Sequence, residues 1–123
     1  MTTIPTQAGT HALTAAALDL AAARAAVDRA LRPLASPSRS ELERLERELR
    51  GHAEALLPVA DVVVGRLWPD SFQGEVRRGE LARIRAGLGP GCGDGMTALA
   101  VHVRVRQLAR DCRVLVAYVE SGQ

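Results

Sequence analysis

Apolar side chains recur at helical spacing through most of this chain, and this periodicity restricts its fold more than any other feature. Three such series stand out: Leu13, Leu20, Val27 and Leu34; Leu42, Leu45, Leu49, Leu56 and Val63; and Val101, Val105, Leu108, Cys112, Leu115 and Val119. Intervals of three, four and seven residues place each series on one face of a helix. The sequence therefore predicts an all-α protein whose helices pack through these faces.

Prolines, glycines and capping residues set the expected limits of four helices: 10–34, 39–67, a third that follows the turn at 68–72 and ends near 88, and 96–119. Ser38 and Glu41 form a capping-box pattern before the second helix, because the hydroxyl can accept an amide of the first turn. Asp70 with Gln73 is the candidate cap of the third helix. That helix has the weakest support, since it contains three glycines and each costs about 1 kcal/mol in a helix interior.

The expected architecture is a four-helix antiparallel bundle, with two points left open. Pro58 lies inside the second apolar series, and proline kinks or breaks a helix because it lacks an amide hydrogen. The bundle has five helices if the second one splits there. In the last segment, Val101, Val103 and Val105 alternate with polar residues, which also fits a strand. A helix is preferred because the four-three spacing covers the whole segment and no turn divides it.

Length and composition are those of one small globular domain. The 123 residues suit a single domain, expected over 10–120 after a flexible tail at 1–9. Apolar residues make up 47% and aromatic residues only 2%, so the core must consist mainly of leucine, valine and alanine. No signal-peptide pattern and no membrane-spanning apolar run occur. Cys92 and Cys112 make no disulfide framework, which favours a reduced, cytoplasmic setting.

All 16 basic residues are arginine, and the net charge is +2. Eight of them fall in the third and fourth helices and could form a basic face: Arg77, Arg78, Arg83, Arg85, Arg104, Arg106, Arg110 and Arg113. Residues 66–123 carry nine arginines against six acidic residues, whereas nucleic-acid-binding domains usually show a stronger and more clustered excess. Contact with nucleic acid is therefore the weakest of the functional hypotheses.

His52 is the residue best suited to acid–base chemistry. It lies on the side of the second helix that carries Leu49 and Leu56, and Glu48 precedes it by one turn. A hydrogen bond from the imidazole to that carboxylate would fix a tautomer and raise its basicity, as a general base requires. A histidine at the boundary of the core is the simpler interpretation. His52 and Glu48 are accordingly candidate catalytic residues without an assigned reaction.

Trp68 and Tyr118 are the candidate ligand-binding residues, for a pocket between helices near Pro58. No cofactor is expected, because the glycine-rich segment 89–95 lacks the lysine of a phosphate-binding loop and has Asp94 where a dinucleotide motif needs glycine. No metal site is expected either. A di-iron bundle carries glutamate three residues before its histidines, and here leucine stands three residues before His52.

Several short motifs of the chain are similar to those of a known family. They are Leu49-Arg50-Gly51-His52, Leu56-Leu57-Pro58, the stretch from Arg83 to Gly91, and Leu108-Ala109-Arg110. Over about 40–120, the chain resembles a family of small helical proteins of unknown function, found in high-GC filamentous bacteria and labelled natural-product biosynthesis proteins. It departs from the family pattern at Val59, where an acidic residue is usual, and over 73–79. The resemblance implies a small helical protein tied to specialised-metabolite gene clusters, and it implies no reaction.

Three functional hypotheses follow, and they leave open whether the protein is an enzyme. The first is a non-catalytic accessory protein that binds a second copy of itself, as a homodimer, or another protein through its helix faces. The second is a small helical enzyme or binder that holds a biosynthetic intermediate in a pocket between helices. The third is a small regulator that contacts nucleic acid through its arginine-rich half. No association with a membrane is expected.

Overall fold

The computed structural model describes residues 20–32, 37–89, 91 and 95–123. They form a helical segment over 20–31 and three further helices: α2 (Arg39–Leu67), α3 (Phe72–Leu88) and α4 (Ala98–Ser121). No strand occurs among these residues, so the described chain is an all-α helical bundle, as the periodicity predicts. The predicted tail at 1–9 and both ends of the predicted first helix lie outside the described residues.

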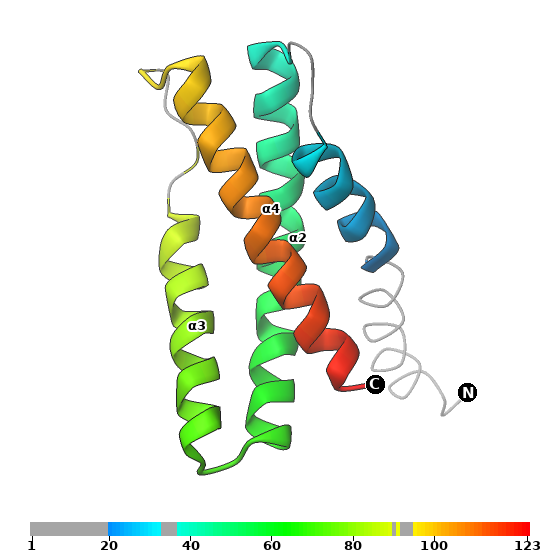
Figure 1. The fold of residues 1–123 in the computed structure, drawn as a ribbon, viewed down its shortest axis with the longest axis vertical. Coiled ribbons are helices and arrows are strands. Elements are labelled where there is room, and N and C mark those ends of the chain that lie inside the picture. The colour runs from blue at the N-terminus through cyan, green and yellow to red at the C-terminus, as the bar shows by residue number, and fades with distance from the viewer. Residues whose placement is uncertain (1–19, 33–36, 90, 92–94) are drawn as a thin grey trace, which may run out of the picture.

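Successive helices run in opposite directions along the bundle (Figure 1). The segment 20–31 leads toward the end where α2 begins, α3 returns beside α2, and α4 runs back across the front of α2. α4 makes its most extensive contacts with α2, and α3 also packs along α2. α2 is therefore the central element of these three helices.

The core is aliphatic, as the scarcity of aromatic residues predicts. Its largest fully enclosed side chains come from three helices: Leu49, Leu56, Leu81, Ile84 and Leu115. Alanines on the segment 20–31 are also enclosed, which allows this segment to approach its neighbours closely. Cys112 belongs to this core, and its thiol donates to the backbone carbonyl of Leu49 across 3.2 Å. Burial raises the pKa of the Cys112 thiol to about 12, so the sulfur is protonated and unreactive at neutral pH.

Helix α2 continues without interruption through Pro58, so the alternative with a fifth helix is wrong. Pro58 and Glu54 both lie on the exposed side of α2, where the carbonyl that loses its amide partner can face water. Leu56, Leu57 and Ala60 are buried on the opposite side and hold the helix together across this point.

The burial of three valines in α4 excludes the strand alternative for this segment. Val101 and Val105 are 0% and 1% exposed, whereas Val103 between them is 60% exposed. Residues two positions apart share one face of a strand, but in a helix their side chains point about 200° apart. Only a helix exposes Val103 to solvent while it buries both Val101 and Val105.

The predicted cap of α2 is confirmed, and the predicted cap of α3 is wrong. Ser38 Oγ accepts the amide of Glu41 at 3.1 Å, as the capping-box pattern indicates. α3 is capped by Ser71, whose Oγ accepts the amide of Gly74 at 3.0 Å. Asp70 instead has a φ of 47°, in the left-handed region that aspartate tolerates, and it turns the chain into α3.

Candidate functional site

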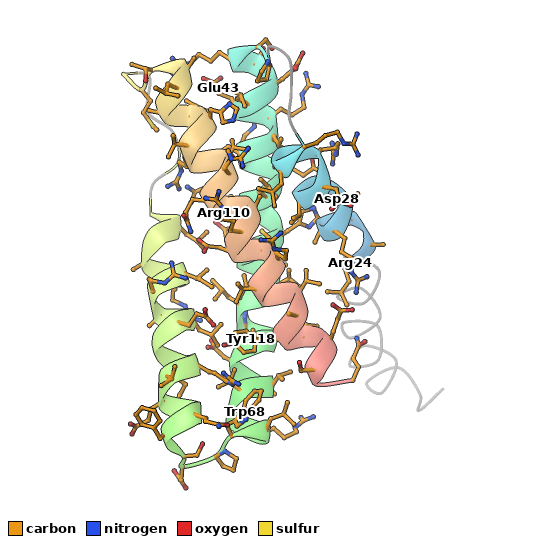
Figure 2. All side chains as sticks on the ribbon, viewed as in Figure 1. Arg24, Asp28, Glu43, Trp68, Arg110 and Tyr118 are labelled. Carbon is orange, nitrogen blue, oxygen red and sulfur yellow. The ribbon has the colours of Figure 1, made fainter. Side chains whose placement is uncertain are left out.

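The two predicted ligand-binding residues meet at one end of the bundle, near the turn that joins α2 to α3 (Figure 2). Trp68 directly follows α2, and Tyr118 lies near the end of α4. Their rings pack edge to face, with centroids 6.5 Å apart and an angle of 77° between the planes. Such pairs contribute about 1 kcal/mol beyond the burial of their surface. This contact fixes the end of α4 against the turn.

Two charged side chains of α3 complete this cluster, and sequence reasoning missed their roles. The guanidinium carbon of Arg77 lies 4.1 Å from the centroid of the Trp68 ring. The Tyr118 hydroxyl donates to Oε1 of Glu80 across 2.5 Å. Glu80 follows Arg77 by three positions, a spacing that places both on one side of α3. This spacing was the available signal, but it does not show that the side faces Trp68 and Tyr118.

These four side chains border a shallow, open depression of about 370 Å³. The remaining lining residues come from α4: Val114, Ala117 and Ser121. Burial raises the pKa of Tyr118 to about 12, and the hydrogen bond to Glu80 and its negative charge add to this effect. The phenol is therefore neutral at physiological pH and remains a hydrogen-bond donor to Glu80. Pro58, beside which the pocket was predicted, is not among the lining residues.

The two candidate catalytic residues lie elsewhere on α2 and do not form a hydrogen bond with each other. His52 Nε2 is 3.9 Å from Glu48 Oε1, which is too long for one. Glu48 Oε1 instead accepts Nη2 of Arg29 at 2.6 Å. The carboxylate expected to orient the imidazole is thus held by the segment 20–31. A general-base role for His52 stays a prediction.

A buried carboxylate, Glu46, organises the opposite end of α3. Its Oε1 accepts Nη2 of Arg50 at 3.1 Å and Nε of Arg104 at 3.2 Å, while only 3% of the residue is exposed. The same two guanidinium groups donate to carbonyls at the end of α3, to Gly89 at 2.7 Å and to Leu88 at 2.6 Å. These carbonyls have no partner within their own helix. The network therefore closes α3 and joins it to α2 and α4.

This network also joins two of the motifs on which the family resemblance rests. Arg50 of the motif at 49–52 donates to the carbonyl of Gly89 in the stretch 83–91. The mixed charges around Glu46 predict a position mostly off the apolar face, and the sequence predicts a basic face for Arg104. The available signal was register: Leu42, Glu46 and Leu49 follow one another at intervals of four and three. The acidic residue therefore occupies a core position of the second apolar series.

Asp111 is a second buried carboxylate, on the side of α4 next to α3, and it is 5% exposed. Nε2 of Gln107 donates to its Oδ1 at 3.1 Å, and Nη2 of Arg83 lies 3.7 Å away. Burial raises the pKa of Asp111 above its ordinary value, although the bond from Gln107 and the charge of Arg83 oppose the shift. Asp111 therefore holds its charge in an environment that disfavours it.

The eight arginines of the predicted basic face do not act as one group. Four of them engage other side chains of the bundle: Arg77 with Trp68, Arg83 with Asp111, Arg85 with Asp61, and Arg104 with Glu46. Arg106, Arg110 and Arg113 of α4 form no ion pair with any described residue. Figure 2 shows Arg110 midway along α4. The uncompensated positive charge of α4 is therefore confined to these three residues.

Two aliphatic side chains share the exposed side of α4 with these arginines. Leu99 is 74% exposed and Val103 is 60% exposed. Together with Arg106, Arg110 and Arg113 they form what we call the outer face of α4, at helical intervals of three and four. Beside this face, between α4 and the end of α3, runs an open groove of about 420 Å³. Its lining includes Val103 and several apolar and charged side chains: Met96, Leu108, Arg83, Arg104 and Asp111.

Comparison with known proteins places the chain in a family without assigning it a reaction. A family model described as a family of unknown function matches residues 21–123. Neither the curated proteins nor the solved structures contain a match. In the part of the chain that the structure describes, no helix has both the length and the hydropathy to cross a membrane. The same residues bring no three histidine, cysteine or acidic side chains together as metal ligands.

Proposed function

Because this chain belongs to DUF6415, a family of unknown function, its role must be inferred from its own surface, and we propose that it is a non-catalytic accessory protein that binds another protein through the outer face of α4. The partner presents an acidic, partly apolar helix or loop. The cellular setting in this proposal is specialised-metabolite biosynthesis in high-GC filamentous bacteria. That setting rests on the motif resemblance over about 40–120.

The outer face of α4 is the observation that carries the proposal. It combines two largely exposed aliphatic side chains, Leu99 and Val103, with three arginines that no described acidic residue neutralises. The three arginines span about 10 Å along the helix axis. Arginine is enriched in protein interfaces, where its guanidinium group pairs with acids of the partner and the neighbouring aliphatic side chains lose their water. The adjacent groove offers space for side chains of a docked helix.

The charge of this face argues for a different protein rather than a second copy as its partner. In a two-fold symmetric dimer the same patch meets itself, so Arg110 would approach the partner's Arg110 without an acid between them. Like charges at an interface oppose association. An acidic partner instead neutralises all three arginines. A homodimer through some other surface stays a prediction.

Nucleic acid fits this face less well than an acidic protein does. Proteins that bind DNA through its backbone commonly contact about 6–10 phosphates, and the face offers only three arginines. Leu99 and Val103, which form one end of it, would meet no apolar surface on a phosphate backbone. Their exposure favours a partner with apolar side chains of its own.

The geometry of His52 and Glu48, the candidate acid–base pair, also favours a non-catalytic role. Glu48 is bound by Arg29 and does not reach His52 at hydrogen-bond distance. If His52→Ala removed an activity of the purified protein, the catalytic alternative would replace the present proposal.

Affinity capture with matched variants tests the interaction. The bait is the full chain, and the test variant carries Arg106→Ser, Arg110→Ser and Arg113→Ser. The control variant carries Arg47→Ser, Arg66→Ser and Arg78→Ser, which remove the same charge from exposed positions on α2 and α3. Captured proteins are compared after nuclease treatment, and each is then purified and titrated against the three baits at low and moderate salt.

We expect a purified partner with an acidic surface to bind the wild type and the control but to lose at least about tenfold in affinity for the α4 variant. Binding should weaken as salt rises, because the contact is electrostatic. Equal binding to all three baits would contradict the proposal, as would binding only to nucleic acid. Deletion of the coding gene tests the metabolic setting, since an unchanged metabolite profile would contradict it.

A further inference from the structure

We infer that the depression bordered by Trp68, Arg77, Glu80 and Tyr118 binds a small zwitterion of the amino-acid type with an aliphatic body. This inference goes beyond the proposed function. The depression is lined by side chains other than those of the outer face of α4, and its ligand is a small molecule rather than a protein.

The first argument is that two opposite charges line the depression without neutralising each other. Arg77 and Glu80 stand three residues apart on α3, where helical geometry commonly allows an ion pair. Here Arg77 stacks on Trp68, and one oxygen of Glu80 is taken by the Tyr118 hydroxyl. A carboxylate has room for several further donors, and a guanidinium carries five N–H groups. A ligand with one ammonium and one carboxylate can therefore engage both.

The second argument is an unused hydrogen-bond donor of Arg77, a residue that lines the depression. Nε of Arg77 is enclosed and has no hydrogen-bond partner among the described residues. A buried donor without a partner is destabilising, so the structure gains when an acceptor reaches it. A carboxylate suits a guanidinium best, because it can accept two parallel N–H groups. Because Nε is enclosed, a ligand reaches it only when the Arg77 side chain turns on the Trp68 ring.

Size and lining then restrict the ligand. About 370 Å³ lies near the lower limit of ligand pockets, so the depression suits one small molecule rather than a nucleotide. Val114 and Ala117 supply an apolar surface for an aliphatic body. A quaternary ammonium ligand fits poorly, because the guanidinium of Arg77 already covers the face of Trp68 that such a cation would need.

The sequence provides a direct reporter for this site, because Trp68 is the only tryptophan in the chain. We would titrate the full chain with L-leucine and with two analogues that each lack one charge, isoamylamine and 4-methylpentanoate. Saturable change in tryptophan emission is expected with L-leucine, and each analogue should bind at least about tenfold more weakly. No saturable change up to about 50 mM L-leucine, or equal binding of either analogue, would overturn the inference.

Variants with matched controls, measured by calorimetry, locate the contacts. Glu80→Gln keeps an acceptor for Tyr118 but removes the charge, and Arg77→Gln removes the guanidinium. Each should weaken L-leucine binding about tenfold. Glu75→Gln and Arg78→Gln change exposed charges of the same helix outside the depression and should leave binding unchanged. If the controls weakened binding equally, the inference would fail.

Ala117→Leu provides a variant that leaves every charge in place. Ala117 is exposed and lines the depression, so a larger side chain there fills the ligand volume without disturbing the core. We expect it to abolish L-leucine binding while the circular dichroism spectrum and melting temperature stay those of the wild type. Retained binding in a folded Ala117→Leu protein would place the ligand elsewhere. This outcome would not affect the proposed partner surface on α4.

Discussion

The guanidinium of Arg104 and the carboxylate of Glu46, 58 positions apart in the sequence, meet at 3.2 Å inside the bundle. The contact connects α4 to α2, and the same guanidinium reaches the carbonyl of Leu88 at the end of α3. One acidic residue in the core thus holds three helices in a fixed arrangement. The two arginines that it binds also donate to the carbonyls of Gly89 and Leu88 at the end of α3.

Replacement of Glu46 should therefore destabilise the whole bundle. Glu46→Ala removes the close counter-charge of the partly buried guanidinium groups of Arg50 and Arg104, which costs about 3 kcal/mol in comparable buried pairs. Urea unfolding followed by circular dichroism measures the loss. Glu54→Ala is the control, because its contact with Arg50 is long and Glu54 is largely exposed. Equal unfolding midpoints for the two variants would show that the network contributes little.

The sequence predicts the helices well because their limits depend on local chemistry. α2 begins directly after Ser38 and ends at Leu67, both as expected, since capping and apolar spacing act within a few residues. The sequence predicts Asp70 in place of Ser71 as the cap of α3, because both residues are good caps one position apart. The left-handed φ of Asp70 decides between them, and it arises from the turn as a whole.

The candidate site was only partly predictable, because it depends on how helices cross. The sequence predicts Trp68 and Tyr118 as ligand-binding residues, but nothing local shows that two rings 50 positions apart come together. Arg77 and Glu80 look like ordinary surface charges until α3 is packed beside α4. Interactions between distant segments follow from the packing of the whole bundle, and no periodicity within one helix specifies them.

Gly74 and Gly79 of α3 should respond in opposite directions to the same substitution. A Cβ on Gly74 would lie 2.1 Å from the carbonyl oxygen of Trp68, so Gly74→Ala must distort the turn. We expect a loss of about 2 kcal/mol in unfolding free energy. Gly79 has no atom within 4 Å of its added Cβ, so Gly79→Ala should gain about 1 kcal/mol from helix propensity. Thermal unfolding of both variants tests this contrast, and stabilisation of both would contradict the close approach at Gly74.

Asp111→Asn should stabilise the protein at neutral pH and lose this advantage in acid. The folded state raises the pKa of Asp111 mainly through burial, so it disfavours the charged form present at pH 7. As the pH falls through the folded pKa, the native state takes up a proton before the unfolded chain does, and wild-type stability recovers. We expect the variant to melt about 3 °C higher at pH 7 and no higher than the wild type near pH 3.5.

The Asn side chain keeps the shape of Asp111 and can still accept the amide of Gln107, so the comparison isolates the charge. Glu75→Gln is the control, because Glu75 is exposed and should change the melting temperature little at either pH. A variant that melts below the wild type at pH 7 would mean that the charge of Arg83, 3.7 Å away, outweighs the cost of burial.

The titration of Tyr118 tests the geometry of the aromatic cluster itself. Tyr118 is the only tyrosine, so ultraviolet absorbance near 295 nm follows its ionisation without interference from another phenol. Burial and the neighbouring Glu80 raise its pKa to about 12, whereas an exposed tyrosine titrates near pH 10. The raised pKa makes the folded protein lose stability as the pH climbs from about 10 toward 12, because the unfolded chain releases its proton first.

Glu80→Gln should lower the apparent pKa of Tyr118, since it removes the negative charge that opposes a phenolate. Burial, the largest cause of the raised pKa, remains in place, and the charge and hydrogen bond of Arg77 still oppose it. Glu75→Gln should leave the titration unchanged, and circular dichroism at each pH confirms that the chain stays folded. A wild-type midpoint near 10 in the folded protein would mean that Tyr118 is exposed to water and does not donate to Glu80.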